Sequence, residues 1–236
     1  MKLGPRLAEV AGLVPRGCVA ADIGTDHAYL PIHLVTNNIC PKVIATEKIS
    51  NPLEKARKTL ELLNLSSKVE LRLGEGLAVL CEEDNVASIV LAGMGGKTIC
   101  RILLEGKNIA SRAGSMVIQP MNDVVLVRRW LVAHGFCLPH ESLVRENGRF
   151  YEIVVAKPGK QLIDDPFLLE IGPALVKKSH PLLASYLETK ICFYGQIQEK
   201  INRSKGNYNE RYLYLERKRL KFKEVLENVA QGTGCY

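Results

Sequence analysis

The chain has 236 residues, of which 47% are hydrophobic and 24% are charged, proportions that are typical of a folded domain and exclude a disordered chain. The sequence contains no run of about 18 apolar residues and begins without the apolar core of a signal peptide, so we expect a cytoplasmic protein without a membrane partner. Seven scattered cysteines form no C-x-x-C pair and five histidines are equally dispersed, so neither a disulfide framework nor a metal site is predicted.

The formal net charge is +7, which is compatible with an anionic partner but does not identify one. The charge is +3 up to Gly159 and +4 beyond it, although the second segment is only half as long. This more basic segment predicts either a salt-sensitive attraction to nucleic acid or simply a solvated helical face.

Apolar runs that are typical of strands alternate with runs of helical spacing. Strands are predicted at 18–23, 42–47, 69–73, 88–92 and 115–119, and helices at 6–13, 29–37, 52–63, 98–105 and 124–134. This alternation predicts an α/β fold with a parallel sheet and crossover helices. Two further extended segments, 137–145 and 150–156, are joined by Asn147-Gly148, which predicts an antiparallel hairpin. Five parallel strand–helix units closed by such a hairpin are typical of class I methyltransferases.

The first strand ends in a carboxylate and runs into a glycine turn. Asp22, Gly24, Thr25 and Asp26 stand at this turn, where a parallel strand that leads into a helix presents free backbone N–H groups to a ligand. The dinucleotide fingerprint G-x-G-x-x-G is absent, because position 26 is Asp and position 29 is Tyr. Acidic groups suit ammonium, sulfonium and ribose hydroxyl groups better than a pyrophosphate, which favours S-adenosylmethionine over NAD. The alternative is that both aspartates only cap the next helix.

The next two strand ends continue this pattern. Glu47 lies 23 residues after Gly24, close to the spacing of about 20 residues at which an acid reaches a ribose in nucleotide-binding α/β folds. Its alternative is a helix-capping or surface acid. The flexible backbone of Gly74-Glu75-Gly76 is predicted to border an adenine ring.

Glycines remove side chains from the end of the fourth strand, in the run Gly93-Met94-Gly95-Gly96. We expect cofactor and substrate to meet there, because glycine permits close approach to the backbone. The alternative, a simple turn before the next helix, explains one glycine better than three. Gln119 and Asn122 close the fifth strand with two amides, which either read the edge of a base or satisfy backbone groups of the loop.

Four separated motifs stand in a defined order: ADIGTDHAYLP at 21–31, AGMGG at 92–96, QPMN at 119–122 and NGRFYE at 147–152. Together they resemble the bacterial tRNA (adenine-22-N1)-methyltransferase family, known as TrmK, over essentially the whole chain. The resemblance implies a class I methyltransferase domain, S-adenosylmethionine as the methyl donor and tRNA as the substrate.

Position by position, the resemblance implies two groups of site residues. The cofactor-binding positions, together with residues next to them in the sequence, are Asp22, Gly24, Thr25, Asp26, Glu47, Lys48, Gly74, Glu75, Gly76, Ala92 and Gly93. The catalytic positions near the target base are Asp26, His27, Met94, Gln119 and Asn122. Many nucleobase N-methyltransferases carry an Asp or an Asn-Pro-Pro-aromatic run at the end of the fourth strand. Here that place is taken by Ala92-Gly93, so no side-chain base is expected.

The implied reaction needs positioning more than a base. Adenine N1 carries an in-plane lone pair that attacks a methyl group directly, and Asp26 is expected to stabilise the cationic product ring. N1 also lies on the Watson–Crick edge, so the adenine must leave its place in the folded tRNA before it reacts. Tyr29, Met94 and Tyr151 are the candidates for stacking on it, with ordinary packing as the alternative.

Beyond Gly159 we expect two helices that fold back on each other. Apolar residues recur at helical spacing from 183 to 201, the pattern breaks at 204–207, and a second stripe runs from Tyr208 to Val229. Arg219 falls on the seam of the second stripe, where a charge costs stability unless it pairs or snorkels. A basic edge suited to a phosphate backbone is predicted from Arg217, Lys218, Lys221 and Lys223.

The sequence thus predicts a methyltransferase domain at 1–159 and a helical, coiled-coil-like C-terminal domain at 160–236, in a chain that we expect to be a monomer. The helical domain either binds tRNA or serves stability or oligomerisation. Two other functions stay open: a methyltransferase of the same fold that acts on another RNA position or a small molecule, and a non-catalytic RNA-binding module that keeps a cofactor pocket.

Overall fold

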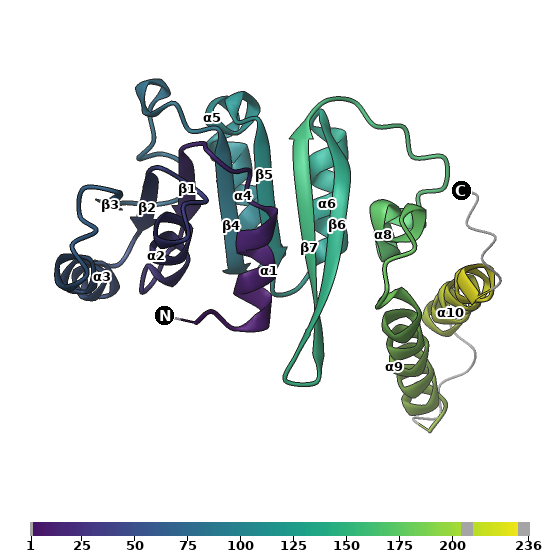
Figure 1. The fold of residues 1–236 in the computed structure, drawn as a ribbon. Coiled ribbons are helices and arrows are strands. Elements are labelled where there is room, and N and C mark those ends of the chain that lie inside the picture. The colour runs from purple at the N-terminus through teal and green to yellow at the C-terminus, as the bar shows by residue number, and fades with distance from the viewer. Residues whose placement is uncertain (1, 204–209, 231–236) are drawn as a thin grey trace. The chain divides into compact units, whose positions relative to one another are not determined.

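A seven-stranded sheet with the strand order β3-β2-β1-β4-β5-β7-β6 forms the centre of the larger part of the chain (Figure 1). Its strands are β1 (Ala20–Ile23), β2 (Val43–Glu47), β3 (Val69–Leu73), β4 (Ser88–Met94), β5 (Ser115–Pro120), β6 (Phe136–Glu146) and β7 (Arg149–Pro158). The first five strands pair in parallel, and β7 runs antiparallel to both β5 and β6. The predicted sheet, closed by an antiparallel hairpin, is therefore confirmed.

Helices cover both faces of this sheet (Figure 1). One face is covered by α1 (Pro5–Leu13), α2 (Tyr29–Thr36) and α3 (Ser50–Leu62), and the other by α4 (Gly96–Glu105), α5 (Lys107–Arg112) and α6 (Val124–Ala133). Because each face is covered, the central strands are apolar on both sides. In β4, for example, Leu91 lies in one core cluster and its neighbour Val90 in the other. The short helices α5 and η1 (Glu82–Asp84) were not predicted, since they are too short to show a period.

The computed structural model describes residues 2–203 and 210–230. The chain divides into two compact units, Met1–Glu170 and Ile171–Tyr236. The segment that follows β7 up to this division belongs to the first unit, because Leu169 is buried in its core and Glu170 Oε1 accepts a hydrogen bond of 2.9 Å from Arg129 Nη2. The sequence places the division earlier, after Gly159.

The end of β4 differs from the prediction in a way that shapes the site. The strand continues to Met94, and its register against β5 shifts between Ala92 and Met94. Gly93 lies at this irregularity with a φ of +81°, which favours glycine. Helix α4 then begins at Gly96, two residues earlier than predicted, where the Gly96 N–H donates to Asn122 Oδ1 at 3.1 Å.

The second unit is helical. It contains α8 (Pro173–Lys177), α9 (Leu183–Arg203) and α10 (Glu210–Ala230), while α7 (Leu168–Ile171) spans the division. As predicted, α9 and α10 pack against each other, with the rings of Tyr194 and Phe222 stacked at 5.6 Å between centroids. Arg219 packs beside Gly195 of α9. A Cβ atom at position 195 would lie 3.4 Å from Arg219 Nη1, so the glycine leaves room for the guanidinium group on the seam between the helices. The predicted break at 204–207 and Tyr208 lie outside the described residues.

Candidate active site

A tight loop connects β1 to α2 and carries the first motif. Gly24, Asp26 and Ala28 have φ angles of +73°, +51° and +56°. For the two residues other than glycine this backbone conformation costs energy, and such conformations cluster at functional sites. The N–H groups of Gly24 and Thr25 both donate to the carbonyl oxygen of Thr46, each at 2.9 Å. These bonds fix the loop at the carboxyl end of the sheet, beside β2.

Glu47, at the end of β2, ties the second strand end to the same loop. Its Oε2 accepts a hydrogen bond from the Asp26 N–H at 3.3 Å, and its Oε1 accepts one from the Ile49 N–H at 3.0 Å. The side chain is buried. Each carboxylate oxygen retains a second acceptor position, so Glu47 can also accept hydrogen bonds from ribose hydroxyl groups.

A cavity of about 260 Å³, here called the first cavity, opens beside the loop. Its lining combines carboxylates, a guanidinium and glycine backbone: Arg6, Leu7, Asp22, Gly24, Thr25, Asp26, His27, Tyr29, Leu30, Ala92 and Gly93. Charged groups of both signs in one small cavity suit a ligand group that carries an ammonium and a carboxylate together.

A second cavity of about 200 Å³ adjoins the first, because Gly24 lines both. Its other lining residues are Ile23, Glu47, Lys48, Gly74, Glu75, Gly76, Met94, Thr98 and Ile102. Aliphatic walls beside a buried carboxylate suit a nucleoside, which has a flat apolar base and a hydroxylated sugar. All eleven residues predicted to bind cofactor line one cavity or the other.

Asp22 is the most perturbed acid of the site. It is only 5% exposed, and burial raises the pKa of its carboxyl to about 6. The nearby Thr25 hydroxyl lowers this pKa and the negative charge of Glu47 raises it further. A cation brought into the first cavity would stabilise the Asp22 carboxylate, so the electrostatics favour a positively charged ligand group.

The Thr25 side chain supplies a direct test of fit. It is buried against the first cavity, and its Oγ1 has no hydrogen-bond partner among the described residues. Buried hydroxyls are normally paired. The Asp22 carboxyl lies close enough for this hydroxyl to lower its pKa, and a polar ligand group in the first cavity would fit the same Oγ1.

Glu75 and Lys48 lie at the rim of the second cavity. Glu75 Oε1 is 2.6 Å from Arg101 Nη2, and this contact lowers the pKa of the Glu75 carboxyl. Glu75 is thus a charged, partnered side chain at the cavity mouth. Within residues 2–203 and 210–230 there is no cluster of three or more His, Cys, Asp or Glu side chains that could hold a metal ion.

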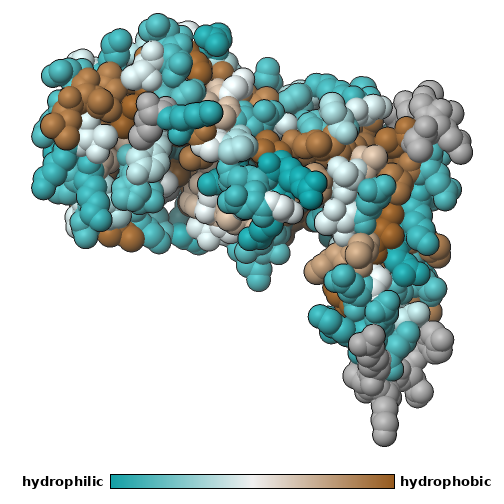
Figure 2. Space-filling view, turned by 60° about the horizontal axis from the view of Figure 1, so that its bottom comes forward, coloured by the Kyte–Doolittle hydropathy of each residue, from teal (hydrophilic) through white to brown (hydrophobic). Residues whose placement is uncertain are grey.

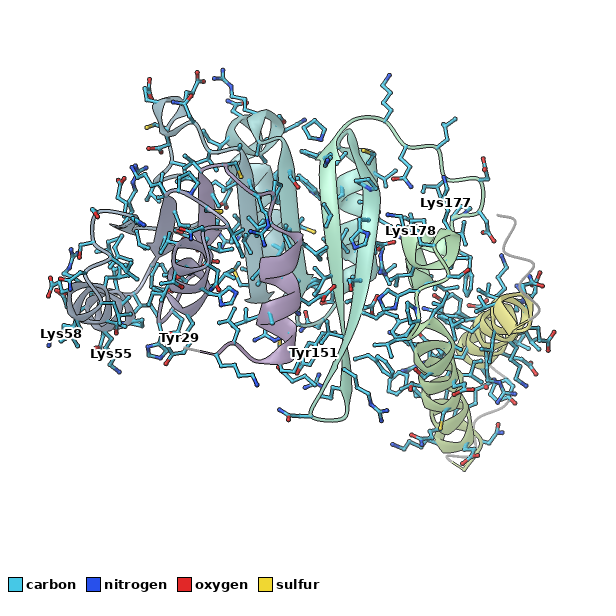
Figure 3. All side chains as sticks on the ribbon, viewed as in Figure 1. Tyr29, Lys55, Lys58, Tyr151, Lys177 and Lys178 are labelled. Atoms are coloured by element: carbon cyan, nitrogen blue, oxygen red, sulfur yellow. The ribbon has the colours of Figure 1, made fainter. Side chains whose placement is uncertain are left out.

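Two of the predicted catalytic residues stand together at the open side of the first cavity. His27 Nε2 lies 3.7 Å from Asp26 Oδ1, and the His27 ring stacks on the Tyr29 ring with centroids 5.4 Å apart. Tyr29 is 44% exposed. Figure 3 shows Tyr29 and Tyr151 at the same edge of the larger unit. The stacked rings of His27 and Tyr29 offer a surface on which an unpaired base can stack.

Met94 lies against the glycine turn. A Cβ at Gly24 would stand 3.6 Å from Met94 Sδ, so the absence of a side chain at Gly24 brings the thioether close to the loop backbone. Met94 lines the second cavity and also packs on the core cluster beneath it. Packing and a contact with the ligand are therefore compatible for this residue.

The two amides at the end of β5 line neither cavity. Gln119 is fully buried; its Oε1 accepts a hydrogen bond from Arg6 Nη1 at 2.5 Å and its Nε2 donates to the Pro120 carbonyl at 2.8 Å. Asn122 Oδ1 accepts the hydrogen bond from Gly96 that begins α4. Of the two alternatives for these amides, the contacts in the structure correspond to the satisfaction of local groups.

The model of the family described as TrmK, tRNA (adenine(22)-N(1))-methyltransferase, matches residues 20–224. The chain belongs to the TrmK family. A Bacillus subtilis tRNA (adenine(22)-N(1))-methyltransferase is 33% identical, over 86% of this chain and 87% of that one.

Solved structures agree with this membership. A Streptococcus pneumoniae protein, 35% identical over 95% of this chain and 100% of its own, gives a TM-score of 0.89, and its complex with S-adenosyl-L-methionine gives 0.83. M. capricolum TrmK in complex with S-adenosyl-homocysteine gives a TM-score of 0.82, with 30% identity over 97% of this chain and 100% of that chain.

In this TrmK-family chain, Arg6, Leu7 and Leu30 line the first cavity but are not among the predicted site residues, and Arg6 is the charged one of the three. Arg6, in α1, donates to Gln119, pairs with Glu146 Oε2 at 3.8 Å and lies over the Tyr151 ring at 5.6 Å. The guanidinium group also lies close to Gly93, because a Cβ atom at that position would be 3.8 Å from Arg6 Nη1. No local pattern marks Arg6, because its partners lie more than a hundred residues away in the sequence.

None of the helices in the described ranges is long and apolar enough to cross a lipid bilayer.

Proposed function

We infer that this protein transfers a methyl group from S-adenosylmethionine to N1 of adenine 22 in tRNA. The observation that carries this inference is the pair of cavities that share Gly24, lined by every predicted cofactor residue, in a chain of the TrmK family. The relatives with S-adenosyl-L-methionine and S-adenosyl-homocysteine support the choice of cofactor.

The two cavities suggest how the chain holds this cofactor. We assign the adenosine to the second cavity, with Glu47 accepting hydrogen bonds from the ribose and Ile102 packing on the base. We assign the amino-acid part to the first cavity, with Asp22 facing the ammonium and Arg6 the carboxylate. The orphaned Thr25 hydroxyl then gains a polar partner.

When bound, S-adenosylmethionine supplies a methyl group on a positively charged sulfur. Adenine N1 has its own lone pair for the attack, so no proton needs to leave first. This agrees with the end of β4, where Ala92 and Gly93 offer no side-chain base. The contribution of this chain is to hold N1 in line with the methyl group and to exclude water, which favours reaction through proximity.

The product adenine is cationic, and Asp26 is the acid at the open side of the first cavity. We propose that its carboxylate stabilises the charge that develops on the ring. His27 and Tyr29 form the stacking surface that receives the adenine after it leaves its pair. Gln119 and Asn122 act as positioning residues, through Arg6 and the start of α4.

We further propose that the larger unit is the methyltransferase domain, that the helical unit contributes to tRNA binding, and that the protein acts as a monomer in the cytoplasm. These assignments rest on the tRNA substrate and on the basic edge of α10. Size-exclusion chromatography with light scattering tests the monomer: a mass near 26.2 kDa is expected, and twice that mass contradicts it.

A methylation assay with position mapping tests the reaction. Transcribed tRNA with adenine 22 should gain one N1-methyladenosine there, and the same tRNA with guanosine 22 should gain none. Methylation at another position contradicts the assignment of the substrate.

Two variants then test the role of Asp26. Asp26→Asn and Asp26→Ala should lower kcat by about tenfold to a thousandfold, since they remove a preorganised charge. The turnover is measured at saturating cofactor, because Asp26 also lines the first cavity. Near-wild-type turnover by both variants at saturating cofactor excludes Asp26 from catalysis.

A further inference from the structure

The hairpin of β6 and β7 extends past the rest of the sheet. Pairing of β7 with β5 stops at Ile118 and Val154, whereas its pairing with β6 continues to Glu146 and Arg149. We call residues 142–153 the arm. In Figure 1 the arm projects beyond β4 and β5 on the side where these strands end, which is the side of the active site.

The arm is braced and not loose. Ser142 Oγ donates a hydrogen bond of 2.7 Å to Glu9 Oε1, and Glu146 Oε1 accepts one of 3.3 Å from the Arg6 N–H. Both contacts come from α1. A braced ribbon loses little conformational entropy when a partner binds, so it can serve as a preformed contact element.

Both faces of the tip of the arm carry an arginine against an aromatic ring. Arg145 lies over Phe150 at 5.7 Å, and Arg149 lies over Tyr151 at 5.8 Å. Side chains alternate along a strand, and Arg145 is paired with Phe150 in the register. The Arg145–Phe150 pair therefore lies on one face of the hairpin and the Arg149–Tyr151 pair on the other.

These two arginines are exposed and form no ion pair within the described residues. The neighbouring acid, Glu146, is already engaged by Arg6. Three exposed arginines elsewhere in the larger unit are paired: Arg101 with Glu75 and Glu105, Arg112 with Glu82, and Arg129 with Glu170. Arg16 is also exposed and has no ion pair within the described residues, but it stands alone and has no second free arginine beside it. The tip of the arm thus carries two uncompensated guanidinium groups, which bind phosphate with two parallel hydrogen bonds.

Arg6 connects the arm to the site. It contacts Glu146 and Tyr151 of the arm and also lines the first cavity beside Gly93. Figure 2 brings this edge of the larger unit forward and shows that hydrophilic side chains predominate on it. A polyanion held at the tip therefore lies close to the place where the base must enter.

We propose that the arm is a phosphate-binding element that grips the tRNA backbone on both sides of the ribbon, through Arg145 and Arg149, and so presents the target adenosine to the cavity. This inference rests on the proposed function. Its chemistry is backbone recognition, which adds affinity without reading sequence.

The test compares two double variants that remove the same charge. Arg145→Gln/Arg149→Gln changes the tip, and Arg16→Gln/Lys107→Gln changes two exposed cations that precede β1 and β5 and form no ion pair within the described residues. The arm variant should raise the KM for tRNA at least about tenfold and lower the salt slope of tRNA binding by about 1–2, as expected for two lost phosphate contacts. The KM for S-adenosylmethionine and the melting temperature should stay at wild-type values.

Three results overturn the proposal: a KM for tRNA within twofold of wild type, an equal rise in the control variant, or a rise accompanied by a loss of cofactor affinity or of folding. Arg145→Lys/Arg149→Lys keeps the charge and should restore the salt slope but only part of the tRNA affinity, because an ammonium group cannot form the two parallel hydrogen bonds of a guanidinium group. Failure of wild-type enzyme to methylate adenine 22 would instead refute the proposed function, so the two failures are distinguishable.

Discussion

Arg6 Nη1 and Gln119 Oε1 are joined by a hydrogen bond of 2.5 Å that links the first helix to the end of β5. The same guanidinium lines the first cavity, so a residue near the start of the chain helps to build the site formed by β1, β2 and β4. The helix α1 is therefore part of the catalytic unit and not only a cover for the sheet.

Substitution of Arg6 should weaken the binding of the cofactor carboxylate. For Arg6→Met we expect the Kd for S-adenosylmethionine to rise about tenfold or more, because a charge-assisted hydrogen bond is lost. The Kd for decarboxylated S-adenosylmethionine, which lacks the group that Arg6 is assigned to bind, should change little. Calorimetry with both ligands measures the difference. Equal losses for the two ligands would show that Arg6 acts through the fold and not through the carboxylate.

The buried Asp22 should make folding and cofactor binding respond to pH in opposite directions. Its pKa is raised to about 6 from the usual value of 3.8 for an aspartate. The folded free protein therefore binds more protons than the unfolded chain between these pH values, and it loses stability as pH rises through them. Asp22→Asn should therefore raise the free energy of unfolding at pH 7 by about 1–3 kcal/mol, which urea denaturation measures. An unchanged or lower stability contradicts this expectation.

Cofactor binding should show the reverse trend. A cationic ligand binds the deprotonated carboxylate, so the affinity of the wild-type protein for S-adenosylmethionine should rise from pH 5 to pH 7 and binding near pH 6 should release protons. Asp22→Asn should bind weakly at every pH in this range, with no such rise. Calorimetry in two buffers of different ionisation enthalpy measures the released protons.

Local patterns in the sequence were sufficient to predict the sheet, and the residues proposed to bind the cofactor line the two cavities at its edge. Each predicted strand end carries its own signal, such as the glycine at position 24 or the acid at position 47, and parallel topology brings these ends to one edge. Contacts between distant segments left no such signal. Arg6 meets Gln119 across 113 residues, and no pattern in the sequence around either residue indicates this contact.

The motif at 147–152 shows the same limit. Its last residue, Glu152, was grouped with the others only by the resemblance, yet it lies in a buried ion network and not at the cavities. Arg128 of α6 pairs there with Glu141 Oε1 at 2.6 Å and with Glu152 Oε2 at 2.9 Å. Sequence spacing cannot indicate such a network, because its three members come from three elements.

Breaking this network should destabilise the whole larger unit. Arg128→Met leaves two buried carboxylates without their cation, and we expect a loss of about 3–5 kcal/mol in the free energy of unfolding. The variant Arg128→Met/Glu141→Gln/Glu152→Gln removes the uncompensated charges and should recover part of this loss. Urea denaturation measures both. A loss below about 1 kcal/mol for Arg128→Met would mean that the network contributes little.

The basic edge of α10 gives a matched comparison within one helix. At about 100° per residue, Arg217 and Lys221 fall on one side of the helix, whereas Lys223 lies about 120° away from Arg217. Lys218 was predicted on this edge, but its Nζ lies over the Tyr194 ring of α9 at 5.0 Å from the centroid. If the edge contacts phosphate, Lys221→Gln should weaken tRNA binding severalfold and lower its salt slope by about 1, while Lys223→Gln should change neither. Electrophoretic mobility shifts at several salt concentrations measure both quantities. Equal effects of the two substitutions would mean that the helix attracts tRNA only through its net charge and that no defined edge binds the backbone.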